Sequence, residues 1–351
     1  MRENREKRPH QKAAAKKQKS GVTSKEERKN RLRRLYFKAF GITLAICAVL
    51  LGAAYGVFLY MVGGLNRSEI DEDKLSVNES VDERVINIAL YGVDSRNHDY
   101  QGRSDVIMIA SVNSKTGQVK LISIARDTYV SIPGYQNTRI NHAYSYGGPE
   151  LAIQTLNENF GMDITDYVTV NFDSLAEVID EMGGVEVDVT EAERQQINAY
   201  LLAGEPLRET GYITLNGPQA VSYSRIRKID NDTMRASRQR EVLASLFEKA
   251  KKINPLEYPA YVRKFAPMVE TSLSNDEILR LASVGLKGSS LSLDQAAFPN
   301  DYIHAEGKII GTAWYYIYDL EQAKDMLHKY LYEDIPFAEY GKPEEEETQE
   351  E

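Results

Sequence analysis

A stretch of 27 consecutive uncharged residues, 39–65, limits what this chain can fold into more than any other feature. It reads AFGITLAICAVLLGAAYGVFLYMVGGL and lies between Lys38 and Arg67. A helix of that length spans about 40 Å, whereas the hydrocarbon core of a bilayer is about 30 Å thick. The apolar region of a cleaved signal peptide is shorter, about 7–15 residues. We therefore predict one uncleaved transmembrane helix.

The charges on the two sides of this stretch predict its orientation. Residues 1–38 hold fifteen Lys or Arg and four Glu, a net charge of +11, whereas residues 63–83 hold two basic and seven acidic residues. Flanks rich in Lys and Arg stay in the cytoplasm. We expect a single-pass cell-membrane protein with a cytoplasmic N-terminus and an extracellular main part. The basic arm contains no recognisable DNA-binding motif, so we expect no nucleic-acid partner.

The rest of the chain divides by composition. Residues 339–351 hold seven Glu and one Lys, which is typical of a solvated, disordered tail, and we expect the basic arm to be disordered as well. The only cysteine, Cys47, excludes an internal disulfide. The predicted segments are a basic arm (1–38), a transmembrane helix (39–65), an acidic linker (66–83), a catalytic domain (84–250), a C-terminal part packed on that domain (251–338) and the acidic tail (339–351).

The exported part alternates between strand and helix patterns. Nearly continuous apolar runs such as residues 105–113, DVIMIASVN, are typical of strands covered on both faces. Alternation of such runs with amphipathic stretches predicts an α/β fold, a mixed central sheet with helices on both faces, preceded by the transmembrane helix. We expect strands near 85–94, 105–113, 119–125, 166–172, 185–189, 293–298 and 311–318, and helices near 149–160, 173–184, 232–250, 256–270, 275–286 and 319–333.

Charged residues gather where three of the predicted strands begin or end. Ligands of open α/β sheets bind outside the carboxyl ends of the strands. Two carboxylates without a local excess of basic residues suggest a hard cation such as Mg²⁺, and Asp94 and Asp105 fit that pattern. The alternative is that these residues are helix caps and surface ion pairs. The residues concerned are Asp94, Arg96, Arg103, Asp105, Arg126 and Asp127.

A second basic cluster occurs in residues 223–240, YSRIRKIDNDTMRASRQR, although the chain as a whole has a net charge of −9. Arg225 and Arg227 share a face if their segment is extended. Arg235 and Arg238 share a helical face, and Arg235 lies in the first turn of a helix that Asp232 can cap. A helix N-terminus attracts anions, and arginine grips phosphate oxygens in pairs. The competing interpretation, a basic solvated helix face, accounts best for the last arginine, at position 240.

Several common catalytic motifs are absent from the sequence. It contains no GxSxG, Walker A, GxGxxG, HExxH or CxxC pattern, and its histidines have no metal-ligand spacing. These absences argue against the enzyme classes that depend on those motifs.

Taken together, the sequence motifs resemble the LytR–CpsA–Psr family of bacterial envelope proteins. The resemblance covers about residues 85–250 and rests on GVDSR, GRSDVIMI, SIARDTYVSIPG, RINHAYSYGG, NFDSLAEVIDEMGGVEVDV, LNGPQAVSYSRIR and DNDTMRASRQREV. It implies a membrane-anchored phosphotransferase that moves an anionic glycopolymer from a polyprenyl-pyrophosphate carrier to a sugar hydroxyl of peptidoglycan. It also implies an apolar pocket for the lipid tail between the sheet and its helices. The sequence carries no signal for one particular glycopolymer or for an oligomeric state.

The resemblance also implies roles for individual residues. It makes Asp94 and Asp105 the Mg²⁺ ligands. Ala125 stands where the family usually has proline, and Arg139 replaces a usual lysine but still supplies a cation. We hypothesise that Asp127 or Asp232 deprotonates or orients the acceptor hydroxyl. The cations expected to bind the pyrophosphate are Arg103, Arg126, Arg225 and Arg227, with Arg96, Arg139, Arg235 and Arg238 nearby.

Three other functions use the same features. A non-catalytic binding protein for polyprenyl pyrophosphates needs the arginines but not the two aspartates. A pyrophosphatase uses water as the acceptor. A transcriptional attenuator would act through the basic arm.

Overall fold

The structure, a computed structural model of the chain, describes residues 10–78, 82–94, 102–202 and 204–340. The chain divides into two compact units, Met1–Tyr60 and Met61–Glu351. Residues 1–9 and 341–351, parts of the predicted basic arm and acidic tail, lie outside the described residues.

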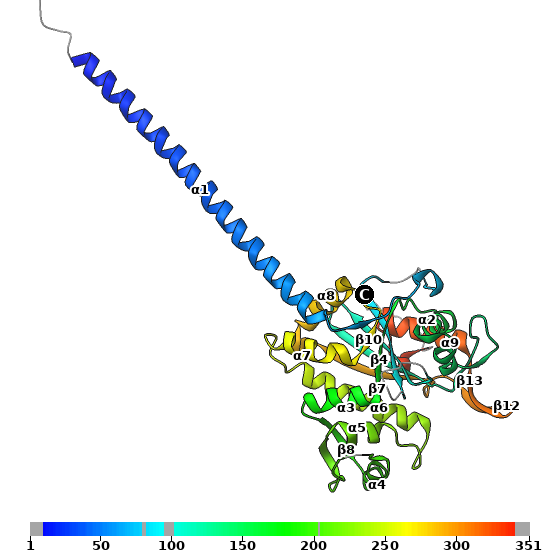
Figure 1. The fold of residues 1–351 in the computed structure, drawn as a ribbon. Coiled ribbons are helices and arrows are strands. Elements are labelled where there is room, and N and C mark those ends of the chain that lie inside the picture. The colour runs from blue at the N-terminus through cyan, green and yellow to red at the C-terminus, as the bar shows by residue number, and fades with distance from the viewer. Residues whose placement is uncertain (1–9, 79–81, 95–101, 203, 341–351) are drawn as a thin grey trace, which may run out of the picture. The chain divides into compact units, whose positions relative to one another are not determined.

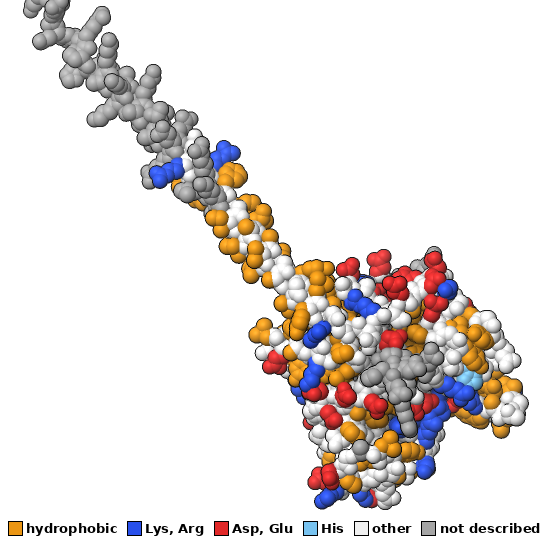
Figure 2. Space-filling model, viewed as in Figure 1, with side chains coloured by type: hydrophobic (Ala, Val, Ile, Leu, Met, Phe, Trp, Pro, Cys, Tyr) orange, Lys and Arg blue, Asp and Glu red, His pale blue; other side chains and the backbone are white. Residues whose placement is uncertain are grey.

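The described part of the first unit is helical throughout and belongs to α1 (His10–Val62), whose last two residues are counted with the second unit. Its segment Phe40–Val62 has a mean hydropathy of 2.3 over 23 residues, so by length and composition it can cross a bilayer. Figure 2 shows hydrophobic side chains along this part of the helix. The structure therefore contains the apolar helix that the sequence predicted, and its orientation stays a prediction. The helix also includes residues 10–38, where charge alone predicted disorder.

The second unit is built on a seven-stranded mixed sheet with the strand order β1-β10-β7-β2-β3-β4-β11 (Figure 1). Strand β3 is antiparallel to both β2 and β4, whereas β7 runs parallel to β2 and β11 runs parallel to β4. The strands are β1 (Asn66–Arg67), β2 (Val85–Val93), β3 (Ser104–Asn113), β4 (Gln118–Ile124), β7 (Asp166–Asn171), β10 (Glu270–Thr271) and β11 (Ser292–Phe298).

Helices cover both faces of this sheet, as the apolar strands predicted. Side chains that alternate along β2 lie on opposite faces, so Ala89, Tyr91 and Val93 share one core with α2 (Asn141–Phe160) and α9 (Leu320–Tyr332). Leu90 faces the other side, where α3 (Phe172–Glu181) and α6 (Asp232–Ala250) contribute side chains to an apolar cavity.

Helix α2 begins eight residues earlier than the sequence predicted. The expected start at Pro149 is in fact a kink, because Gly147 and Gly148 have non-helical backbone angles there. Gly148 has a φ of 66°, which glycine adopts without the strain a side chain would cause. The sequence signal for a helix start therefore marked an interruption within a longer element.

The predicted strand 185–189 exists, but it does not join the central sheet. Strand β8 (Val185–Val189) pairs with β9 (Gly211–Leu215) in a separate ribbon, and its side chains alternate between buried and exposed. This ribbon, α4 (Glu191–Tyr200) and α5 (Gly217–Ser224) form a second core, which Figure 1 shows at one end of the unit. Sequence analysis missed β9, α4 and α5. The strict alternation in VEVDV was the signal of a half-covered ribbon.

The C-terminal part shares the first core, since β11 extends the central sheet and α9 packs beneath it. Two further short strand pairs complete the unit, β5 with β6 and β12 with β13. The predicted linker contributes β1 to the sheet and Leu75, which is fully buried, to the core. The remaining elements are β5 (Tyr129–Val130), β6 (Thr138–Arg139), β12 (Ala305–Ile310), β13 (Ala313–Tyr318), α7 (Tyr258–Phe265), α8 (Asn275–Gly285) and the short 3-10 turns Glu72–Lys74, Ala266–Met268, Gly288–Ser290 and Phe337–Glu339.

Candidate active site

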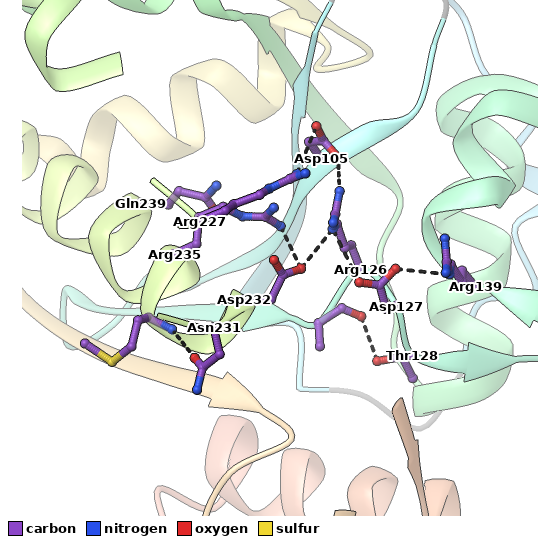
Figure 3. Close-up of polar contacts among 12 residues, drawn as sticks. Asp105, Arg126, Asp127, Thr128, Arg139, Arg227, Asn231, Asp232, Arg235 and Gln239 are labelled. Carbon is purple, nitrogen blue, oxygen red and sulfur yellow. Dashed lines mark hydrogen bonds and ion pairs between the residues drawn. The ribbon is translucent and has the colours of Figure 1, made fainter. Parts of the chain in front are cut away.

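The register of the central sheet brings the predicted strand-end residues to one edge. Val93 at the end of β2 pairs with Ser104 at the start of β3, and Ser123 near the end of β4 pairs with Met108. The residues that flank these positions therefore meet. Asp105 and Arg126 form an ion pair with 2.5 Å between Oδ1 and Nη1 (Figure 3).

Arg126 is the centre of this cluster. Besides Asp105, its Nε donates a hydrogen bond to Oδ2 of Asp232 at 3.0 Å and lies 3.5 Å from Oδ2 of Asp127. Burial lowers the pKa of Arg126, but Asp232, Asp127 and Asp105 together raise it above its ordinary value. The guanidinium is therefore held charged and positioned by carboxylates on three sides.

Helix α6 directs its N-terminus at this cluster. Its N-cap is Asn231, whose Oδ1 accepts from the Met234 amide at 3.0 Å, so the prediction that Asp232 caps the helix was wrong. Because Asn231 takes the capping role, Asp232 can face the sheet and accept from Arg126 and from Nη2 of Arg235 at 3.1 Å. Burial raises the pKa of Asp232, but Arg235 and Arg126 lower it more, so this carboxylate stays ionised.

Arg235 is buried, with 4% of its surface exposed. Its Nη2 binds Asp232, but Nε and Nη1 have no hydrogen-bond partner among the described residues. Burial, and next the charge of Arg126, lower its pKa to about 10. Buried charged donors without a partner are costly, and phosphate oxygens are acceptors that match a guanidinium fork. This side chain is therefore suited to an anion.

Asp127 differs from Asp232 in the direction in which its pKa is shifted. Burial raises the pKa of Asp127, an effect that Arg126 and Arg139 oppose only in part. Nε of Arg139, on β6, lies 3.2 Å from Oδ1 of Asp127 and also donates to the backbone oxygen of Trp314 at 3.0 Å. A buried carboxylate with a raised pKa is a better proton acceptor than one held ionised by ion pairs.

Arg225 and Arg227 also reach the edge, but their segment is not extended, which was the condition under which the sequence placed them on one face. Arg225 ends α5 with a helical backbone, φ −101° and ψ −2°. Ile226 between the two arginines is fully buried in the second core, which fixes the turn. Arg225 Nη2 lies 3.5 Å from Asp94 Oδ2, and Arg227 Nη2 lies 3.5 Å from Asp105 Oδ2. Both guanidinium groups stay partly exposed beside the cluster.

Two further predicted cations, Arg103 and Arg238, have no ion pair with this cluster in the described part of the chain. Arg238 is buried and donates to Glu193 at 2.7 Å, with an ion pair to Asp230, so it connects α6 to the second core. Arg103 is exposed near His142, whose pKa is lowered by burial first and then by the charge of Arg103. Arg96 lies outside the described residues.

Arg240 was assigned to a solvated face, and this was wrong. Its Nε and Nη1 are buried without a hydrogen-bond partner in the described part of the chain, and burial lowers its pKa.

Two adjoining cavities complete the site. The first is small, about 40 Å³, and its lining mixes apolar and charged side chains; we call it the polar cavity because that lining includes Arg126, Asp127, Asp232 and Arg235. The second is apolar, about 240 Å³, and lies between the sheet and helices α3 and α6. Val106 and Gln239 line both cavities, so the apolar space opens beside the arginines. The apolar lining, which the sequence did not give, includes Leu90, Met108, Val168, Val170, Phe172, Leu175, Val178, Val242, Leu243, Leu246 and Val269.

A further apolar groove extends this cavity. It shares Val178, Leu243, Leu246 and Val269 with the cavity, and its lining continues along α7 and includes Leu65. The apolar path is therefore longer than the single cavity.

The predicted magnesium ligands form only part of a coordination shell. Among the described residues, no three His, Cys, Asp or Glu side chains gather as a metal site. Asp94 and Asp105 are each paired with arginines. Mg²⁺ commonly takes one or two carboxylates and completes its shell with water and substrate phosphates. Two carboxylates of this kind would match that mode of binding.

Sequence analysis missed Trp314 and Tyr316, which also line the polar cavity. The run AWYYIY at 313–318 predicted only a strand, although it contains the single tryptophan of the chain. Clustered aromatic residues near the end of an otherwise ordinary strand were the available signal.

Comparison of the chain with known proteins identifies the family to which it is similar. The model of the LytR_cpsA_psr family matches residues 61–331. The chain is 31% identical over 324 residues to "Polyisoprenyl-teichoic acid--peptidoglycan teichoic acid transferase TagU" of Oceanobacillus iheyensis, covering 86% of this chain and 95% of the relative. Among solved structures, TagT bound to LIIa-WTA superposes with a TM-score of 0.63 at 26% identity, covering 75% of this chain and 99% of that one. YwtF (TagT) with bound octaprenyl pyrophosphate lipid has a TM-score of 0.59 at 24% identity, covers 75% of this chain and 99% of that one, and shows the same fold.

Proposed function

The chain belongs to the LytR_cpsA_psr family, and we propose that it is a Mg²⁺-dependent phosphotransferase of the cell membrane. It moves an anionic glycopolymer from a polyprenyl-pyrophosphate carrier to a sugar hydroxyl of peptidoglycan. The observation that carries this proposal is the junction at Val106 and Gln239, where an apolar cavity meets an arginine-lined polar one. A molecule with a long hydrocarbon tail and a compact, highly charged head matches that junction.

The prenyl tail occupies the apolar cavity and the diphosphate lies among the guanidinium groups. Arg235 supplies two buried donors that lack protein partners in the described structure, and Arg225 and Arg227 supply charge from the partly exposed side. Several cations aimed at one diphosphate stabilise the charge that develops on its oxygens during transfer. The name of the TagU relative and the lipid bound by YwtF agree with this substrate class.

Asp127 accepts the proton in this mechanism. The acceptor hydroxyl attacks the phosphorus that carries the glycopolymer, and its proton passes to the carboxylate of Asp127. A new bond forms between that oxygen and phosphorus, and the bond to the bridging oxygen of the diphosphate breaks. The electron pair leaves with the polyprenyl phosphate. Asp232 keeps Arg126 and Arg235 in place, because ion pairs hold it ionised.

Asp94 and Asp105 would hold Mg²⁺ together with phosphate oxygens of the substrate. The ion would neutralise charge on those oxygens. Asp94 is paired with Arg225 and Asp105 with Arg227, so if the two carboxylates held the ion, these two guanidinium groups would be left for the diphosphate.

The test uses the full chain in detergent micelles with Mg²⁺, a polyprenyl-pyrophosphate-linked glycopolymer and peptidoglycan oligosaccharides. We expect a covalent polymer–peptidoglycan product whose formation stops when a chelator removes Mg²⁺. Release of free polymer at the same rate without peptidoglycan would make the protein a pyrophosphatase. Tight binding of the lipid without any turnover would make it a binding protein.

Arg227→Ala is the matching variant. Its side chain is 43% exposed, so we expect the fold to survive and transfer to fall about 10²- to 10³-fold, as when one donor to a transition-state oxyanion is lost. Arg208→Ala removes another exposed arginine, which lines neither cavity, and should leave transfer unchanged. Equal activity of the two variants would remove Arg227 from the site.

A further inference from the structure

We propose that the β12–β13 hairpin is the acceptor subsite, in which Trp314 and Tyr316 hold the peptidoglycan sugar ring that presents the attacking hydroxyl. This inference rests on the proposed transferase function. The hairpin is a separate two-stranded sheet, and Figure 1 shows β12 projecting from the body of the second unit. Five of the six residues of β12 are exposed.

The hairpin is bound to the same loop that carries Asp127. The Tyr316 amide donates to the backbone oxygen of Asp127 at 2.9 Å, and Thr128 forms a bridge with Tyr316. On the other face of β13, the rings of Tyr315 and Tyr129 pack edge to face with centroids 5.0 Å apart. The position of the hairpin is therefore coupled to the position of the proposed proton acceptor.

Arg139 adds a second connection. Its Nε lies 3.2 Å from Oδ1 of Asp127 and donates to the backbone oxygen of Trp314 at 3.0 Å. One guanidinium thus contacts both the carboxylate that would take the proton and the strand that carries the indole. An acceptor held by the hairpin would have its hydroxyl close to this carboxylate.

Trp314 and Tyr316 lie two residues apart on β13, so they share a face, and both line the polar cavity. Their rings pack edge to face, with centroids 5.1 Å apart. The indole lies against Gly307 of β12, where an added Cβ would be 2.6 Å from Cζ2 of Trp314. Because glycine has no Cβ, the ring can lie against the hairpin backbone and still be 39% exposed.

The geometry of the reaction indicates which substrate lies against Trp314 and Tyr316. In phosphoryl transfer the attacking and leaving oxygens are roughly in line with the phosphorus between them. The leaving lipid phosphate lies toward the apolar cavity, which adjoins at Val106 and Gln239. Trp314 and Tyr316 line the polar cavity only. The attacking group therefore approaches from the hairpin.

A sugar ring matches the chemistry of these two aromatic side chains. The faces of aromatic rings are electron-rich and attract the weakly positive C–H groups of a sugar ring, while polar groups nearby orient its hydroxyls. The aromatic rings of Trp314 and Tyr316 suit the C–H face of a sugar ring better than they suit the anionic polymer, which Arg126 and Arg235 in the same lining attract.

The first test measures binding directly, because Trp314 is the only tryptophan of the chain. Full-length protein in detergent micelles is titrated with a peptidoglycan tetrasaccharide free of peptide, and tryptophan fluorescence is recorded. We expect a saturable change in emission with the wild type. A flat titration up to millimolar tetrasaccharide overturns the inference.

The second test separates acceptor binding from donor binding. Trp314→Ala should raise the KM for peptidoglycan oligosaccharide about 10-fold or more and leave the KM for the lipid-linked donor within about twofold. Trp314→Phe should restore part of the affinity. Gly307→Ala should raise the acceptor KM in the same way, because the new methyl group displaces the indole without removing it.

Tyr212→Ala, at an exposed tyrosine on β9, is the control and should change neither KM. Wild-type transfer with an unchanged acceptor KM in Trp314→Ala overturns this inference alone. A wild type that hydrolyses the donor without transferring to peptidoglycan overturns the proposed function, and this inference with it.

Discussion

At the scale of single residues, Arg235 and Arg238 show that neighbouring arginines on one helix have different tasks. Both are almost fully buried, at 4% and 2% exposure. Arg238 binds Glu193 and Asp230, whereas Arg235 leaves two nitrogens without partners among the described residues. A buried charge with unmet hydrogen bonds costs stability, a pattern that is typical of binding sites.

We predict opposite effects for the matched substitutions. Arg235→Met should keep the free energy of unfolding within about 1 kcal/mol of the wild-type value, or raise it, because the substitution removes a costly buried charge. Geranylgeranyl pyrophosphate should raise the unfolding temperature of the wild type, and Arg235→Met should abolish that rise. Arg238→Met should cost about 3–5 kcal/mol, because it leaves two carboxylates unpaired. Thermal unfolding of the full chain with and without this probe checks both, and equal losses would show that Arg235 is structural.

Asp127 leads to a pH prediction. Burial raises its pKa above the ordinary carboxyl value, and the proposed role needs the deprotonated form. Transfer should therefore be lost as the pH falls through that raised pKa and be complete at higher pH. The profile of kcat/KM against pH measures this loss, which forms the acidic limb of the profile. Asp127→Asn should remove most of the activity together with the limb, whereas Asp232→Asn should lower the rate and keep the limb.

The raised pKa of Asp127 also affects stability. Folding favours its protonated form, so its contribution to stability is fully present below the unfolded pKa and lost as the pH rises through the folded value. The same ionisation that enables proton transfer thus works against the fold.

At the scale of elements, close packing of α5 on α3 positions the arginines that follow α5. A Cβ on Gly217 would lie 2.0 Å from the backbone oxygen of Ala176, so the two helices approach at a distance only glycine permits. The N-cap Asn216 and a capping box with Gln219 fix the start of the same short helix. The position of Arg225 at its other end depends on this approach.

Gly217→Ala should therefore destabilise the protein by about 1–3 kcal/mol, as overpacking does. It should also lower transfer, because α5 moves and Arg225 moves with it. Gly285→Ala is the control, since an added Cβ there meets nothing within 4 Å and alanine favours the helix by about 0.5–1 kcal/mol. Chemical denaturation measures both, and a neutral Gly217→Ala would contradict the packing argument.

At the scale of the whole molecule, the apolar cavity and the groove along α7 adjoin and form one apolar path. Leu246 lines both parts. A path of this kind discriminates by chain length, because each added isoprene unit buries more apolar surface only while there is room for it.

Leu246→Trp should block the path between the two parts. Affinity for undecaprenyl pyrophosphate should fall about 10-fold, while affinity for farnesyl pyrophosphate should stay within about twofold. Leu202→Trp, at a leucine 86% exposed, should change neither affinity. Equal losses for long and short chains would place the block at the head group instead.

The family and most of the central sheet follow from the sequence. Apolar runs identify β2, β3, β4 and β7, and each run depends only on residues close together in the chain. The charged residues at the ends of these strands were predicted to meet, and Asp105 and Arg126 do. Local patterns are sufficient for such features because solvation and strand propensity act over a few residues.

Other parts of the site were decided only by contacts between distant segments. Nothing near Arg238 in the sequence indicates that Glu193 would neutralise it, or that β8 would pair with β9. The alignment of Trp314 with the polar cavity depends on Gly307 and on the backbone of Asp127.

The sequence by itself determined the long apolar helix, the buried strands and the kind of charge at the site, because each is a property of neighbouring residues. Only the tertiary structure decided which arginines are left for a ligand, where the apolar cavity opens and which aromatic side chains border it. The physical reason is that pairing and burial depend on partners brought together by folding, at separations along the chain that local preferences do not register.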